Sequence, residues 1–171
     1  MTLVGTPTLF IDGEWCASSD GGRRPTYNPY DASVIMHVDE ATSNDARRAI
    51  AAAKAFFSSS DWSRRSYQDR CELLNRMADS LQKNKAELAR IETIDTGKTL
   101  GESEIDIDDV TNVFRFYAKE ALKLAEDKRV TGPLVPESVK SLVVHEPVGV
   151  CVLITPWNYP CLLYTSPSPR D

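Results

Sequence analysis

Residues 146–160 read EPVGVCVLITPWNYP and carry most of the information about the fold. Residues 148–154 are continuously apolar apart from one glycine, which is typical of a strand buried on both faces of a parallel sheet. The two prolines that follow, Pro156 and Pro160, exclude a regular element there. Because α/β enzymes place ligands where a buried strand leads into an irregular loop, we expect chemistry at this loop.

Upstream of this strand, apolar residues at helical spacing predict four helices. Thr42 and Asp45 form a capping-box pattern at the start of the first helix, Gly97 is a plausible stop for the third, and the acids in residues 102–106 suit the positive end of the fourth. We interpret all four apolar stripes as core packing. They are Ala46, Ala49, Ile50, Ala53 and Phe57; Leu73, Leu74, Met77 and Leu81; Leu88, Ile91 and Ile94; and Val110, Val113, Phe114, Tyr117, Ala121 and Leu124.

Three short β-structures are predicted around these helices. Residues 9–15 are typical of a hairpin, because Asp-Gly between apolar runs favours a type I′ turn. Residues 34–38 have the β-branched content of a strand. Residues 141–146 alternate in the way expected of an antiparallel strand.

The composition excludes several classes of protein. The chain has 171 residues, of which 42% are hydrophobic and 26% charged, as in an average soluble domain. A net charge of −5 predicts neither a nucleic-acid partner nor an anionic membrane partner. The first residues lack a signal-peptide pattern, and no apolar run is long enough to span a bilayer, so we expect a cytoplasmic protein with reduced thiols. With two histidines and no CxxC pair, a His/Cys metal cage is not expected.

The chain resembles the aldehyde dehydrogenase superfamily. The resemblance rests first on residues 146–150 together with Ile-Thr-Pro-Trp-Asn-Tyr-Pro at 154–160, and it extends from about residue 8 to residue 160. Within it, Asp-Ile-Asp-Asp-Val at 106–110 and Trp-Asn-Tyr-Pro at 157–160 are most similar to the betaine-aldehyde and aminoaldehyde branch. Other segments with counterparts in the family are residues 9–15, 27–29, 92–99 and 116–118.

This resemblance implies an α/β fold, of which the chain holds the N-terminal part: a helical segment, the start of a Rossmann-like parallel sheet and an antiparallel oligomerisation arm. Residues 1–136 would then form the N-terminal part of the cofactor-binding domain, and residues 137–147 the strand of the oligomerisation arm. Residues 148–163 would form the first strand and loop of the nucleotide-binding sheet. Residues 164–171 do not continue the family pattern, and we interpret them as a non-native tail.

The resemblance also implies an activity, the oxidation of an aldehyde, with betaine aldehyde expected, to the carboxylate with NAD or NADP. A cysteine thiolate attacks the aldehyde, hydride leaves the thiohemiacetal, and a glutamate base activates the water that hydrolyses the thioester. We interpret Cys151 and Cys161 as packing or incidental thiols, so the nucleophile is absent and the chain is expected to be an inactive, truncated part of a homo-oligomeric (dimeric or tetrameric) parent. The alternative is a non-catalytic interaction module of the same fold.

The loop after the predicted strand carries the implied catalytic and cofactor residues. Asn158 matches the side-chain amide that donates to the developing oxyanion, a role suited to a neutral and rigidly held donor. The alternative is an Asn that completes a turn between prolines. Ile154, Thr155, Pro156 and Trp157 match positions that line the cofactor cleft, and plain core packing at a strand end is the alternative, above all for Ile154.

Two further groups of residues match binding sites in the family. Tyr159 matches an aromatic of the aldehyde tunnel, where a π-face attracts a quaternary ammonium group; the alternative is a Tyr that only fills the wall. Thr26, Tyr27 and Asp95 match a monovalent-cation site for K⁺ or Na⁺, made of two backbone carbonyls and one carboxylate. The alternative for Asp95 is a hydrogen bond to a local turn.

Overall fold

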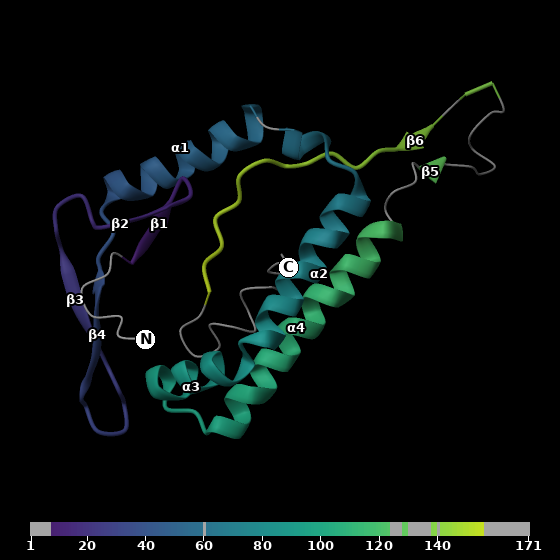
Figure 1. The fold of residues 1–171 in the computed structure, drawn as a ribbon. Coiled ribbons are helices and arrows are strands. Elements are labelled where there is room, and N and C mark those ends of the chain that lie inside the picture. The colour runs from purple at the N-terminus through teal and green to yellow at the C-terminus, as the bar shows by residue number, and fades with distance from the viewer. Residues whose placement is uncertain (1–7, 60, 124–127, 130–137, 140, 156–171) are drawn as a thin grey trace.

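The computed structural model of the chain describes residues 8–59, 61–123, 128–129, 138–139 and 141–155. Two β-hairpins come first, a group of helices follows, and a short strand pair leads into an extended segment (Figure 1). The described strands form three separate antiparallel pairs. The helices therefore provide the core of the described chain.

The first hairpin joins β1 (Leu9–Ile11) to β2 (Glu14–Cys16). Asp12 and Gly13 both have positive φ angles, 55° and 82°, as a type I′ turn requires, so the predicted hairpin is confirmed. The second hairpin pairs β3 (Arg23–Tyr27) with β4 (Val34–Asp39), with an irregularity in register at the end of β3. The strand predicted over residues 34–38 is confirmed, whereas β3 was not predicted.

All four predicted helices are present among the described residues. They are α1 (Ser43–Ser59), α2 (Tyr67–Lys83), α3 (Lys85–Thr96) and α4 (Leu100–Lys123), and a short 3₁₀ helix η1 (Asp61–Arg64) links the first two. The predicted capping box is formed, because Thr42 N donates to Asp45 Oδ2 at 3.0 Å and Asp45 N to Thr42 Oγ1 at 3.2 Å. Gly97 ends α3 in the left-handed conformation, with φ 78°, as predicted.

A seam of small side chains joins α2 to α4, which lie side by side (Figure 1). Cys71 and Ala78 are one heptad apart on α2, and Thr111 and Ala118 are one heptad apart on α4. All four are buried, and Ala78 is fully inaccessible. Small residues at such positions let two helix backbones approach closely, so the seam fixes the distance between the helices.

Of the four predicted core stripes, that of α4 contains a buried residue, Val110, those of α2 and α3 are at most half-buried, and that of α1 is largely exposed. Val110 is 4% exposed, but Ile50 on the apolar stripe of α1 is 47% exposed, and the one buried residue of α1 is Asp45. The elements that pack on α1 include β1 and η1, which are too short to cover a helix of 17 residues. Other stripe residues are also partly exposed (Met77 41%, Ile91 44% and Tyr117 43%), and Leu124 lies outside the described residues.

The final described segment differs from the predicted parallel strand. The predicted antiparallel strand is confirmed in shorter form, because β6 (Leu142–Val143) pairs with β5 (Lys128–Arg129). Residues 144–155 form no strand, and Val148 and Ile154 are 95% and 91% exposed. A strand buried on both faces needs parallel neighbours and covering helices. No described residue supplies a parallel neighbour, so the prediction of a buried strand is wrong for this structure.

The small-residue seam predicts a specific sensitivity to added volume. Replacing Ala78 with Leu inserts a branched side chain where no space is left, so Ala78→Leu should destabilise the chain by about 1–3 kcal/mol. Ala55→Leu, at an exposed position of α1, is the matched control and should change stability little. Urea unfolding followed by circular dichroism measures both. Equal stability of the two variants would contradict a tightly packed seam.

Candidate functional site

The loop predicted to hold the catalytic and cofactor residues is described only at its start. Ile154 is 91% exposed and Thr155 is half-buried, so the core-packing alternative is wrong for Ile154 in this structure. An exposed apolar side chain beside a hydroxyl fits a surface that a cofactor covers, and that role stays a prediction. The other four predicted residues lie outside the described residues: Pro156, Trp157, Asn158 and Tyr159.

The structure brings the two segments of the predicted cation site close together. Thr26 and Tyr27 end β3, and Asp95 lies two residues before Gly97 at the end of α3. A Cβ atom on Gly97 would lie 2.9 Å from Cγ of Pro29, so the loop after β3 touches the end of α3. Asp95 is exposed and accepts no hydrogen bond from a described residue, so the local-turn alternative is not observed. Cation binding stays a prediction, because its expected ligands include backbone carbonyls.

The described cysteines occupy three different environments. Cys71 is buried in the seam, where Asn75 Nδ2 lies 3.5 Å from its Sγ, and Cys16 is half-buried in β2. Cys151 is exposed, so of its two interpretations packing in a buried strand is wrong, whereas an incidental thiol stays a prediction. Cys161 lies outside the described residues. Among the described residues the cysteines are free thiols.

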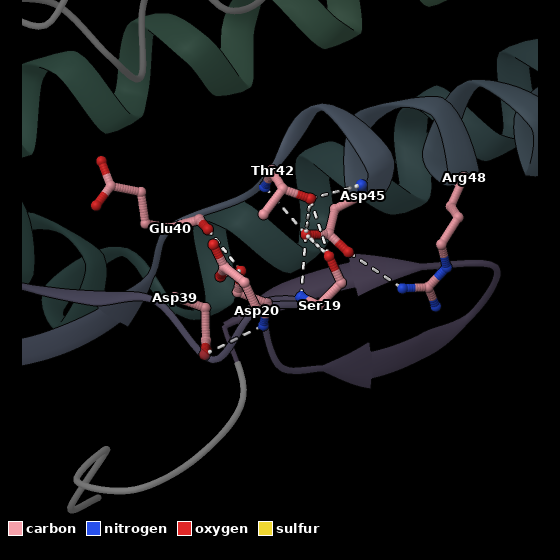
Figure 2. A network of polar contacts seen from close by, with 8 residues as sticks. Ser19, Asp20, Asp39, Glu40, Thr42, Asp45 and Arg48 are labelled. Atoms are coloured by element: carbon pink, nitrogen blue, oxygen red, sulfur yellow. Dashed lines mark hydrogen bonds and ion pairs between the residues drawn. The ribbon is translucent and has the colours of Figure 1, made fainter.

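A buried carboxylate organises the start of α1, as Figure 2 shows. Asp45 is 1% exposed, and its Oδ2 accepts hydrogen bonds from the backbone and hydroxyl groups of both Thr42 and Ser19, at 2.8–3.1 Å. Its Oδ1 pairs with Arg48 at 3.2 Å. The backbone N–H groups of Thr42 and Ser19 hold the pKa of Asp45 well below its ordinary value. With both oxygens engaged, Asp45 has a structural role.

A second carboxylate, Asp39 at the end of β4, binds the chain segments on either side of the first hairpin. It accepts hydrogen bonds from Thr8 N at 2.8 Å, Thr8 Oγ1 at 2.9 Å and Ser18 N at 3.4 Å, and Arg23 Nε lies 3.7 Å away. The N–H group of Thr8 is the main reason why the pKa of Asp39 is lowered. Asp39 and Asp45 therefore tie the first hairpin to β4 and α1.

Three charged side chains meet between α3 and α4. The Lys98 ammonium group pairs with Glu92 Oε1 at 3.2 Å and with Asp106 Oδ2. Burial acts to lower the pKa of Lys98, but its hydrogen bonds to Asp106 and Glu92 outweigh that effect and raise it. Asp106 thus lies beyond the first turn of α4 as a partner in a buried ion cluster, and Glu102 is the acid in the first turn, where the helix dipole acts. Glu92 Oε2 is buried without a hydrogen-bond partner among the described residues.

Comparison with known proteins assigns the family. Residues 15–168 match the profile of the aldehyde dehydrogenase family, which is most of the chain. The chain belongs to the aldehyde dehydrogenase family. It is 42% identical over 155 residues to a betaine aldehyde dehydrogenase from Bacillus subtilis (strain 168), covering 91% of this chain and 31% of that relative. It is 40% identical over 165 residues to a peroxisomal aminoaldehyde dehydrogenase 2 from Pisum sativum, covering 95% and 33%.

Solved structures of aldehyde dehydrogenases agree with this fold. A betaine aldehyde dehydrogenase from Staphylococcus aureus in complex with NAD⁺ superposes with a TM-score of 0.82 at 41% identity, covering 91% of this chain and 30% of that one. This chain therefore has the fold of the start of an aldehyde dehydrogenase and spans about a third of the length of its relatives. Within the described residues, no helix combines the length and apolar character needed to cross a bilayer.

The carboxylate network predicts a pH-dependent stability. Because the pKa of Asp45 is lower in the folded chain than in the unfolded chain, its contribution is complete above about pH 4 and is lost as the pH falls below that value. Asp45→Asn should lower the Tm by several degrees at pH 7 and by progressively less below pH 4. Thermal melts between about pH 2 and pH 7 measure this difference.

The matched control is Asp109→Asn, at an exposed carboxylate of α4, which should stay close to the parent chain throughout this pH range. A deficit for Asp45→Asn that is constant with pH would show that the ionised carboxylate is not the stabilising group.

Proposed function

We propose that this chain supplies the N-terminal third of an enzyme that oxidises an aldehyde to a carboxylate with NAD⁺. Membership of the aldehyde dehydrogenase family supports the reaction class, and the NAD⁺ complex of the Staphylococcus aureus relative supports the cofactor. The proposal includes a cytoplasmic homo-oligomer and a monovalent cation bound near Asp95. Use of NADP in place of NAD is the alternative for the cofactor.

The proposed substrate class rests on one observation, a difference in ion pairing among the three aspartates in residues 106–109. Asp106 pairs with buried Lys98, and Asp108 pairs with Lys85 at 2.6 Å. Asp109 is exposed and has no ion pair among the described residues. Two of the three carboxylates thus stabilise the helix packing, and Asp109 is available to a ligand.

We propose that Asp109 attracts a cationic aldehyde, such as betaine aldehyde or an ω-aminoaldehyde. Phe116 lies two turns further along α4, close to the same face of the helix, and is 57% exposed. A carboxylate with aromatic side chains nearby is the usual environment of a quaternary ammonium group. The names of the relatives from Bacillus subtilis and Pisum sativum indicate aldehydes of this kind.

The residues of the predicted loop at 154–158 have proposed roles in binding and catalysis. Bound NAD⁺ would accept the hydride, and Ile154 and Thr155, with Pro156 and Trp157, would contact it through apolar surface and backbone. The Asn158 amide would donate to the oxygen that gains negative charge when a thiolate attacks the aldehyde.

We propose that the nucleophile and the base lie in the part of the relatives that this chain does not match, so that the chain alone has no turnover. Of its three described cysteines, Cys71 is buried in the seam and Cys16 lies in a hairpin strand, and neither position suits a nucleophile. The third, Cys151, is exposed, and we interpret it as an incidental thiol. A non-catalytic interaction module is the alternative. A reading frame that encodes the remaining two-thirds would decide between the two.

The oxyanion role predicts the effect of one substitution in the complete enzyme. Asn158→Ala should reduce kcat by about a hundredfold or more, the usual effect of removing one oxyanion donor. NAD⁺ affinity, measured by calorimetry, should change little, because the amide acts on the aldehyde oxygen. Turnover within a few-fold of the parent enzyme would contradict this role.

The substrate proposal predicts a selective effect at Asp109. The complete enzyme should prefer betaine aldehyde several-fold over an uncharged aldehyde of equal length, since a cation near aromatic faces gains roughly 0.5–2 kcal/mol. Asp109→Asn should lower kcat/KM several-fold for the cationic aldehyde and leave the neutral one unchanged.

Asp108→Asn is the matched control, because Asp108 already pairs with Lys85; it should lower stability without changing this preference. Steady-state assays with both aldehydes measure the ratio. Equal losses on the two substrates in Asp109→Asn would contradict an electrostatic role for Asp109.

A further inference from the structure

A groove between the start of α2 and the end of α4 has no place in the proposed reaction. Its volume is about 600 Å³, which lies within the usual range for small-molecule sites in proteins. The described residues of the predicted cofactor and cation sites do not line it. The groove is therefore a separate candidate for a ligand.

The floor and walls of the groove are apolar and aromatic. Leu73 and Leu74 of α2 face Ala121 of α4, and Tyr67 and Tyr117 add aromatic surface. Leu73, Leu74 and Ala121 are half-buried, so the groove is open enough to admit a ligand and deep enough to remove it from water. Burial of an alkyl or aromatic group there gains roughly 25 cal/mol per Å² of apolar surface.

Among the described residues, the groove is lined by two cations, Arg70 and Lys123, and one acid, Glu120. Glu120 pairs with Lys123. The Arg65 and Arg70 guanidinium groups lie 5.7 and 5.3 Å from the centre of the Trp62 ring, which also lines the groove. Arg70 Nη2 also donates to Trp62 O at 3.0 Å, so this cation is held in position before any ligand arrives.

We propose that the groove binds an amphipathic carboxylate, with its alkyl or aromatic body on the leucine floor and its carboxylate beside Arg70 and Lys123. The described lining is mostly apolar, and its two cations outnumber its one acid, which favours an anionic head group over a cationic or neutral one. The proposal stands apart from the aldehyde reaction, whose substrates would be small and cationic. It rests on the groove and its charges alone.

The test uses two probes of equal chain length and opposite charge. Decanoate and decyltrimethylammonium are titrated into the 171-residue chain by calorimetry, well below the concentrations at which they form micelles. Decanoate should bind at least about tenfold more tightly than the cation. Equal binding of the two would overturn the proposal by showing unselective adsorption to exposed apolar surface. Undetectable decanoate binding at about 1 mM would also overturn it.

Matched variants locate the bound decanoate. Ala121→Phe fills the groove and should weaken decanoate binding about tenfold or more, whereas Ala55→Phe, on the exposed face of α1, should leave it unchanged. Lys123→Gln should weaken it several-fold, whereas Lys119→Gln, an exposed residue outside the groove, should not. Circular dichroism confirms that each variant is folded. Full affinity in Ala121→Phe would place decanoate elsewhere and overturn the assignment.

Discussion

The close approach of α2 and α4 is the constraint on which the remaining helical structure depends. Because Ala78 and Ala118 have little side-chain volume and are buried, they allow the two helices to pack closely along the seam. α3 must then fit between the end of one helix and the start of the other, and Gly97 provides the left-handed turn that allows it. The groove lies at the other end of the same helix pair, where larger residues such as Leu73 and Tyr117 line it.

Ionised carboxylates hold the parts of the chain that have little apolar core. The hairpins bury few side chains, and Asp39 and Asp45 compensate by collecting backbone N–H groups from Thr8, Ser18, Ser19 and Thr42. Each such bond satisfies a donor that would otherwise be left without a partner inside the protein. At the α3–α4 corner the carboxylates of Glu92 and Asp106 pair with the Lys98 ammonium group instead of with backbone N–H groups. Asp39, Asp45 and Asp106 therefore have structural roles, whereas the Asp109 carboxylate is exposed and forms no ion pair among the described residues.

The sequence predicted those features that depend on neighbours in the chain. Apolar spacing located four helices, and the residue pairs Thr42 with Asp45 and Asp12 with Gly13 located a helix start and a turn.

β3 was missed because Pro25 and two arginines argue against a strand, although a two-stranded sheet tolerates all three. The buried strand predicted at residues 148–154 does not form for another reason. Apolar content alone does not show which segments will cover a strand. The Lys98 cluster was missed because its members meet only after the helices pack. For the site, the motif at 154–160 identified Asn158 by resemblance. The structure adds the exposure of Ile154 and shows that Asp109 has no ion pair among the described residues.

Two of the glycines with positive φ angles, Gly13 and Gly97, differ in how freely they can be exchanged during evolution. At Gly13 a Cβ atom would meet nothing within 4 Å, so the requirement there is only for a positive φ, which Asn or Asp can also adopt. At Gly97 the positive φ coincides with the contact to Pro29, and a side chain would displace the loop that follows Tyr27. Replacement of Gly13 by Asn or Asp should therefore have little effect on the stability of the hairpin. A substitution at position 97 would alter both the end of α3 and the loop after β3. One residue therefore constrains the sequence of both segments.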